Sequence, residues 1–115
     1  MKDLEEIRQR VANFAQERDW EQFHSPKNLA MALSVEVAEL LEHFQWLSES
    51  QSYDLDELTR RAVAEEIADV QVYLVRIADT LGIDILASVS SKMEQNAQKY
   101  PADKVRGSAK KYSEY

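Results

Sequence analysis

Chain breakers are scarce in this sequence, because its 115 residues include only two glycines and two prolines. The apolar residues between them recur at spacings of three and four positions, which is the period of a helix that buries one face. In the first segment, for example, this stripe consists of Leu4, Ile7, Val11, Phe14 and Ala15. The pattern predicts an all-α protein.

Polar capping residues divide the chain into four predicted helices. These helices are expected over residues 3–18 with Asp3 as N-cap, over residues 26–47 after Ser25, from Asp54 or Asp56 to Gly82, and from Asp84 to Lys99. Pro101 cannot continue the last of them. Residues 48–52 are expected to be a loop, residues 1–101 one domain, and residues 102–115 a polar, mobile tail.

The charge balance argues against some classes of partner. With 14 basic and 21 acidic residues the net charge is −7, so no nucleic acid and no membrane partner is expected, since those contacts depend on basic patches. There is no cysteine and hence no disulfide or thiolate metal site. Neither a signal-peptide core nor a stretch of about 20 apolar residues is present, so a soluble cytoplasmic protein is expected.

Two pairs of acids lie within apolar stripes. Glu36 and Glu39 share the side of the second helix that carries Leu33 and Leu40, and residues 62–70 repeat the pattern of residues 32–40, with Glu66 and Asp69 in the matching places. Acids three positions apart project from one side of a helix. Carboxylates that face a core are costly unless they are paired or bind a cation. Two packed helices would therefore gather four carboxylates at one site.

All-oxygen ligation of this kind suits Mg²⁺, with Mn²⁺ as a possible substitute. An alternative is that the acids are solvated and paired with Arg60, Arg61 or Arg76 on an ordinary helical bundle. A di-iron site would need Glu-x-x-His on two of the acid-bearing helices, but the residue three after Glu39 is Glu42 and the one three after Asp69 is Val72.

Glu36-Val37-Ala38-Glu39 and Glu66-Ile67-Ala68-Asp69 resemble the metal signature of the all-α MazG-like pyrophosphohydrolases. Three further stretches are similar to the dCTP pyrophosphatase branch of that family: residues 18–24, residues 44–46, and the segment from Lys92-Met93 to Lys99-Tyr100-Pro101. The resemblance implies a four-helix MazG-type bundle in a homo-oligomer, commonly a homotetramer built as a dimer of dimers. It also implies Mg²⁺-dependent hydrolysis of a nucleoside triphosphate to the monophosphate and pyrophosphate, for cleaning or balancing the deoxynucleotide pool, with dCTP or a modified dCTP favoured.

The resemblance assigns the four acids as metal ligands and catalytic residues, and Glu36 or Glu39 is expected to orient the attacking water. Lys92, Asn96 and Lys99 share one face of the last helix and match the family segment that meets the triphosphate. Without the resemblance, a solvated face of a surface helix would be the preferred explanation for them.

Aromatic side chains flank the helix that carries the first acid pair. Trp20 and Trp46 can stack on a base, with His24 beside them, although core packing is the alternative. Tyr73, one turn after Asp69, is expected to contact a sugar or phosphate or else to be buried. Val11 stands where a polar, base-reading residue is expected in vertebrate-like members of the branch.

Two other functions stay open on the sequence alone. One is a non-catalytic helical oligomerisation or regulatory module in which the acids are solvated. The other is a related enzyme that acts on a different pyrophosphate-containing metabolite, because phosphate and metal binding do not themselves read the base.

Overall fold

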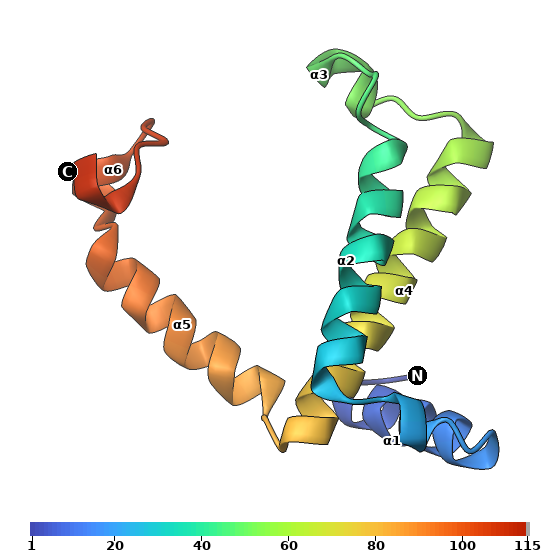
Figure 1. The fold of residues 1–115 in the computed structure, drawn as a ribbon. Helices are drawn as coiled ribbons and strands as arrows, with labels where there is room; N and C mark the ends of the chain where they lie inside the picture. Colours follow the sequence, from blue (N-terminus) through green and yellow to red (C-terminus); the bar gives the residue numbers. More distant parts are fainter. Residues whose placement is uncertain (115) are drawn as a thin grey trace. The chain divides into compact units, whose positions relative to one another are not determined.

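The computed structural model of the chain describes residues 1–114, which contain helices and no strand (Figure 1). The four long helices are α1 (Leu4–Glu17), α2 (Pro26–Glu42), α4 (Glu57–Leu81) and α5 (Ile85–Lys99). The short elements are the 3-10 helices η1 (Glu21–Phe23) and η2 (Tyr112–Glu114) and the α-helices α3 (Glu49–Ser52) and α6 (Ala102–Val105). The predicted all-α class and its four main helices are confirmed.

The long helices begin where side-chain caps allow. The side-chain oxygens of Asp3, Ser25, Asp56 and Asp84 each accept a hydrogen bond from a backbone N–H three residues later, at 2.7 to 3.1 Å. Such caps satisfy amides that have no partner within the helix. The third long helix is capped by Asp56, not by Asp54, and ends at Gly82, whose φ of 67° suits glycine.

The structure differs from the predicted helices at two places. Residues 49–52 form the helix α3 where a loop was predicted, because Ser48 and Gln51 make a reciprocal capping box that supports a single turn. Helix α2 ends at Glu42, not near residue 47. Beyond it the amides of His43 and Phe44 bond to carbonyls three residues earlier, so the last turn tightens.

The chain divides into two compact units, one from Met1 to Gly82 and one that starts at Ile83. In the first, α2 and α4 lie side by side and run antiparallel, and α1 packs against α4 (Figure 1). The second contains α5, α6 and η2. Three of the four predicted long helices thus pack together in the first unit, while the predicted domain boundary at residue 101 stays a prediction.

The core of the first unit is small. Its buried apolar residues are Ala15, Leu29, Val63, Val75 and Ala78. Arg76 is buried among them at 9% exposure.

No helix within residues 1–114 is both long and apolar enough to cross a membrane.

Many large apolar side chains are exposed instead. On α2 and α4 they include Met31, Val35, Leu41, Leu58, Ile67 and Leu74, and on α5 they include Leu86, Val89 and Met93. Large exposed apolar patches generally mark interaction surfaces or ligand-binding grooves.

Candidate metal centre

Three carboxylates from two helices converge between α2 and α4. Glu36 and Glu39 project from α2 and Glu66 from α4, and one oxygen of each lies within 4.8 Å of the others. All three side chains are half-buried. The predicted convergence of acids from the two helices is present, since the two helices pack directly against each other.

The cluster leaves two buried oxygens without a donor. Glu36 Oε2 and Glu66 Oε2 are buried and accept no hydrogen bond. Desolvation raises the pKa of Glu36, and a hydrogen bond with Glu39 and the charges of Glu39, Asp69 and Glu66 raise it further. The pKa of Glu66 is raised by desolvation and by Glu39 and Asp69, with His43 opposing. A buried carboxylate oxygen without a partner is costly, and a divalent cation would satisfy it.

Positive side chains do not neutralise this cluster. Arg61 pairs with Glu57 at 3.4 Å, and Arg76 pairs with Asp79 at 3.4 Å. Over residues 1–114 no lysine or arginine forms a salt bridge with the clustered acids. The nearest cationic candidate is His43, whose Nε2 is 4.0 Å from Glu66 Oε1, beyond hydrogen-bond distance. Pairing with Arg61 or Arg76 therefore does not account for the acids.

Asp69, the fourth predicted ligand, lies one turn after Glu66 and is exposed. It is outside the group of three whose oxygens lie within 4.8 Å. Its charge nevertheless raises the pKa of both Glu36 and Glu66, so it lies at the border of the same cluster.

The turn after α1 brings Trp20 beside His24. Asp19 has a φ of 54°, and the amides of Asp19 and Trp20 bond back to the carbonyls of Gln16 and Ala15 at 3.1 and 2.9 Å. This is a Schellman motif with an aspartate in the left-handed position. The ring centroids of Trp20 and His24 are 6.5 Å apart at 63°, and Trp20 stays 44% exposed.

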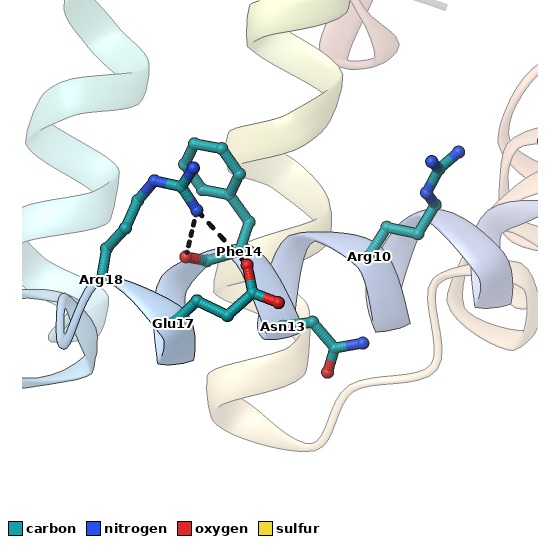
Figure 2. A pocket seen from close by; sticks show the side chains of 5 residues that line it. All are labelled: Arg10, Asn13, Phe14, Glu17 and Arg18. Carbon is teal, nitrogen blue, oxygen red and sulfur yellow. Dashed lines mark hydrogen bonds and ion pairs between the residues drawn. The ribbon is translucent and has the colours of Figure 1, made fainter.

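A groove along α1 has a different lining. Figure 2 shows Arg10, Asn13, Phe14, Glu17 and Arg18, none of which is a predicted site residue. The Arg18 guanidinium lies 3.5 Å from the centroid of the Phe14 ring and donates to the Phe14 carbonyl at 3.2 Å. Phe14 in turn meets Trp20 edge-on with centroids 5.7 Å apart. Phe14, which lines this groove, thus also contacts Trp20.

The other predicted substrate residues belong to several elements. Trp46 follows α2 and is 88% exposed, and Tyr73 is half-buried on α4. Lys92, Asn96 and Lys99 belong to α5 in the second unit. Lys99 Nζ lies 5.6 Å from the Tyr112 ring centroid. Val11, on α1, is half-buried.

The hydrogen bond between Arg76 and His24 was not predicted from the sequence, because Arg76 was considered only as a possible partner for the acids. Its Nε donates to His24 Nδ1 at 3.1 Å, across 52 residues. A signal was present, since Arg76 stands between Val75 and Ile77 on a buried part of α4 and has Asp79 one turn later. An arginine in such a place needs specific partners.

Comparison with known proteins places this geometry in a family. The sequence model of the MazG-like family matches residues 31–115, a range that includes all four acids. The chain belongs to the MazG-like family, and its fold is the all-α fold of that family.

The sequences of individual relatives align with most of this chain. It is 49% identical over 115 residues to a Rattus norvegicus protein named dCTP pyrophosphatase 1, and 46% identical over 113 residues to its Homo sapiens namesake. Each alignment covers 96% of this chain and 66% of the relative, so the chain spans slightly less than two thirds of the length of these curated relatives. The crystal structure of a pyrophosphatase from Archaeoglobus fulgidus is 44% identical, with a TM-score of 0.80, covering 84% of this chain and 91% of that one.

Proposed function

We propose that this protein hydrolyses deoxynucleoside triphosphates to the monophosphate and pyrophosphate, using Mg²⁺ held by Glu36, Glu39, Glu66 and Asp69. The observation that carries the proposal is the convergence of three carboxylates within 4.8 Å between α2 and α4. The names of the relatives, dCTP pyrophosphatase 1 and a pyrophosphatase, support the same reaction.

The donor set fits a hard divalent cation. All candidate ligand atoms are carboxylate oxygens, and two of the buried ones, on Glu36 and Glu66, have no hydrogen-bond donor. Mg²⁺ takes oxygen ligands and is usually held by few carboxylates together with water and substrate phosphates. Mn²⁺ has similar preferences and is expected to substitute. A non-catalytic module would leave the two buried oxygens unexplained.

The chain's own residues supply the rest of the chemistry. When bound, the metal offsets the charge of the triphosphate and of the phosphorus under attack. Glu36 or Glu39 accepts a hydrogen bond from the attacking water, orients it and takes its proton.

Base recognition is assigned to the aromatic side chains. Trp20 and Trp46 are both exposed enough to stack on a base, and His24 lies beside Trp20. Tyr73 is placed on the sugar or phosphate, and Lys92, Asn96 and Lys99 on the triphosphate. A dCTP or modified dCTP substrate is favoured by the names of the relatives. A task in deoxynucleotide house-cleaning or pool balance, and a cytoplasmic location, remain predictions.

We also propose that the chain works as a homo-oligomer, a homotetramer built as a dimer of dimers. Support comes from the exposed apolar residues of α2 and α4 and from α5, which has no buried residue of its own. A self-complementary apolar face is what a two-fold interface requires. In such an assembly one site can be lined by more than one subunit, which would bring the cations of α5 to a cluster of acids.

The test is a substrate panel with matched variants. The protein is incubated with Mg²⁺ and dCTP, modified dCTP, dTTP, dUTP, dATP or ribonucleotides, and pyrophosphate is measured. Release from at least one deoxynucleotide is expected, and it should be lost in Glu36→Gln and Asp69→Asn but kept in Glu65→Gln, an exposed neighbour of the cluster. No release with any nucleotide, or undiminished release from the two site variants, refutes the proposal.

Specificity has its own control. Trp20→Ala and Trp46→Ala should change the ratio of rates between nucleotides, because a stacking platform contributes differently to different bases. Unchanged ratios would exclude the stacking role while leaving the reaction itself in place.

A further inference from the structure

Arg76 is the one charged residue in the described part of the chain that is buried. Its guanidinium donates to His24 Nδ1 at 3.1 Å and to Asp79 Oδ2 at 3.4 Å. The other oxygen of Asp79 accepts from Arg8 Nη1 at 3.2 Å. The network joins α4, α1 and the segment before α2, and it supplies Arg76 with the partners that a buried charge requires.

This contact determines which ring nitrogen of His24 carries the proton. A guanidinium has five donors and no acceptor, so the Nδ1 atom that faces it must be an unprotonated acceptor. Neutral His24 therefore bears its hydrogen on Nε2. Within residues 1–114 no group accepts a hydrogen bond from that Nε2–H, which leaves a free donor.

Protonation of His24 is disfavoured in the same arrangement. Burial and the adjacent charge of Arg76 lower the pKa of His24, and only Glu21 on η1 opposes them. On the far side of Arg76 from His24, Asp79 accepts a hydrogen bond from the guanidinium. Asp79 is itself held by Arg8. His24 is thus neutral at pH 7 and keeps one tautomer.

The imidazole that carries this free donor lies next to an exposed aromatic ring. His24 meets Trp20 edge-on, and Trp20 is braced by Phe14. We propose that Arg76 is a positioning residue, which holds His24 as the neutral Nε2–H tautomer so that it donates a hydrogen bond to an acceptor atom of the base stacked on Trp20. This inference rests on the proposed function for the presence of a base, and it adds a specificity role for a residue that touches no substrate.

The tautomer is tested without any substrate. The chain has only two histidines, so ¹⁵N spectra of the imidazoles, with His43→Gln for assignment, resolve His24 alone. The wild type should show the Nε2–H form and a titration midpoint below the ordinary 6.5. Arg76→Met should give a mixture of tautomers and a higher midpoint, whereas Arg61→Met, the same change at an exposed site of α4, should alter neither.

An Nδ1–H form in the wild type, or identical spectra for wild type and Arg76→Met, overturns the proposal. Far-ultraviolet circular dichroism shows whether each variant folds. If Arg76→Met does not fold, Arg76→Gln replaces it, because an amide can donate or accept and so permits both tautomers. Arg76→Lys, which has only donors, should retain the Nε2–H form.

Kinetics then test the role in specificity. With the full chain and Mg²⁺, Arg76→Met should raise KM for the preferred nucleotide about two- to tenfold, the usual effect of one neutral hydrogen bond, with kcat nearly unchanged. In a His24→Ala background the same change should have no further effect on KM. A fall in kcat alone, or an equal rise in KM for every nucleotide, overturns the specificity role.

These outcomes separate the two proposals. If no nucleotide is hydrolysed, the proposed function fails and the specificity role fails with it, while the spectra still decide the tautomer. If hydrolysis is normal but Arg76→Met leaves the preference between bases unchanged, the positioning role fails and the proposed function stands.

Discussion

Metal binding by the acid cluster should be visible as thermal stabilisation. Glu36→Gln removes one charge and one metal ligand while keeping the size of the side chain. We expect Mg²⁺ to raise the melting temperature of the wild type and to leave that of the variant nearly unchanged. In EDTA the variant should melt at the same temperature as the wild type or higher, because it has lost one of several like charges that lie within 4.8 Å of each other.

The size of the effect follows from mass action and chain length. A cation present at 100 times its dissociation constant stabilises the folded state by about 2.7 kcal/mol. For 115 residues the entropy of unfolding is about 240 cal/mol/K, which converts that free energy into a rise of about 11 °C.

Differential scanning calorimetry at one fixed protein concentration measures this rise, since oligomers melt at concentration-dependent temperatures. Glu65→Gln is the matched control, because Glu65 adjoins Glu66 in sequence but is exposed. It should keep the full rise with Mg²⁺. Equal rises in the wild type and in Glu36→Gln would refute the reasoning that the cluster holds the metal.

Three further predictions concern acid titration, the turn before Trp20 and the core. The folded-state pKa of Glu36 is raised above 4.5, so its stabilising contribution is complete below that pH and is lost as the pH rises through the raised value. In EDTA the free energy of unfolding of the wild type should therefore fall relative to that of Glu36→Gln as the pH rises above 4.5. A difference between the two free energies that does not change with pH would contradict this. Asp19→Val should lower the free energy of unfolding by about 1–2 kcal/mol and alter Trp20 fluorescence, because valine strains the left-handed backbone at this position. Asp19→Gly should change the free energy of unfolding by less than about 1 kcal/mol, because glycine adopts this conformation readily. Leu29→Ala, at a site 2% exposed, should cost about 2–5 kcal/mol in urea denaturation, against about 0.5 kcal/mol or less for the exposed Lys27→Ala, and equal costs would exclude Leu29 from the core.

Local features were predictable from the sequence because local hydrogen bonds determine them. Asp3, Ser25 and Asp84 cap helices as expected, since each cap bonds to an amide only three residues away. Helix α3 was missed because one capped turn of four residues is too short to show an apolar stripe.

The acid cluster was predictable for a different reason. Glu36 and Glu66 each lie within an apolar stripe, so packing the two stripes together brings the carboxylates together. The more exposed position of Asp69 depends on how the helices pack, which periodicity does not determine.

Long-range contacts were beyond the sequence. The bond from Arg76 to His24 joins residues 52 positions apart, and nothing in the spacing pairs them. Phe14 belongs to the apolar stripe of α1 yet is 48% exposed, and its ring instead contacts Trp20 and the Arg18 guanidinium.

Product analysis of one reaction tests the central claim most directly. When dCTP is incubated with the wild type and Mg²⁺ and the phosphorus products are followed by ³¹P NMR, dCMP and pyrophosphate should appear in equal amounts, and neither should appear with EDTA or with Glu36→Gln. Formation of dCDP and orthophosphate, or of any products at an undiminished rate in Glu36→Gln, would contradict the assignment of these acids to a metal-dependent pyrophosphohydrolase site.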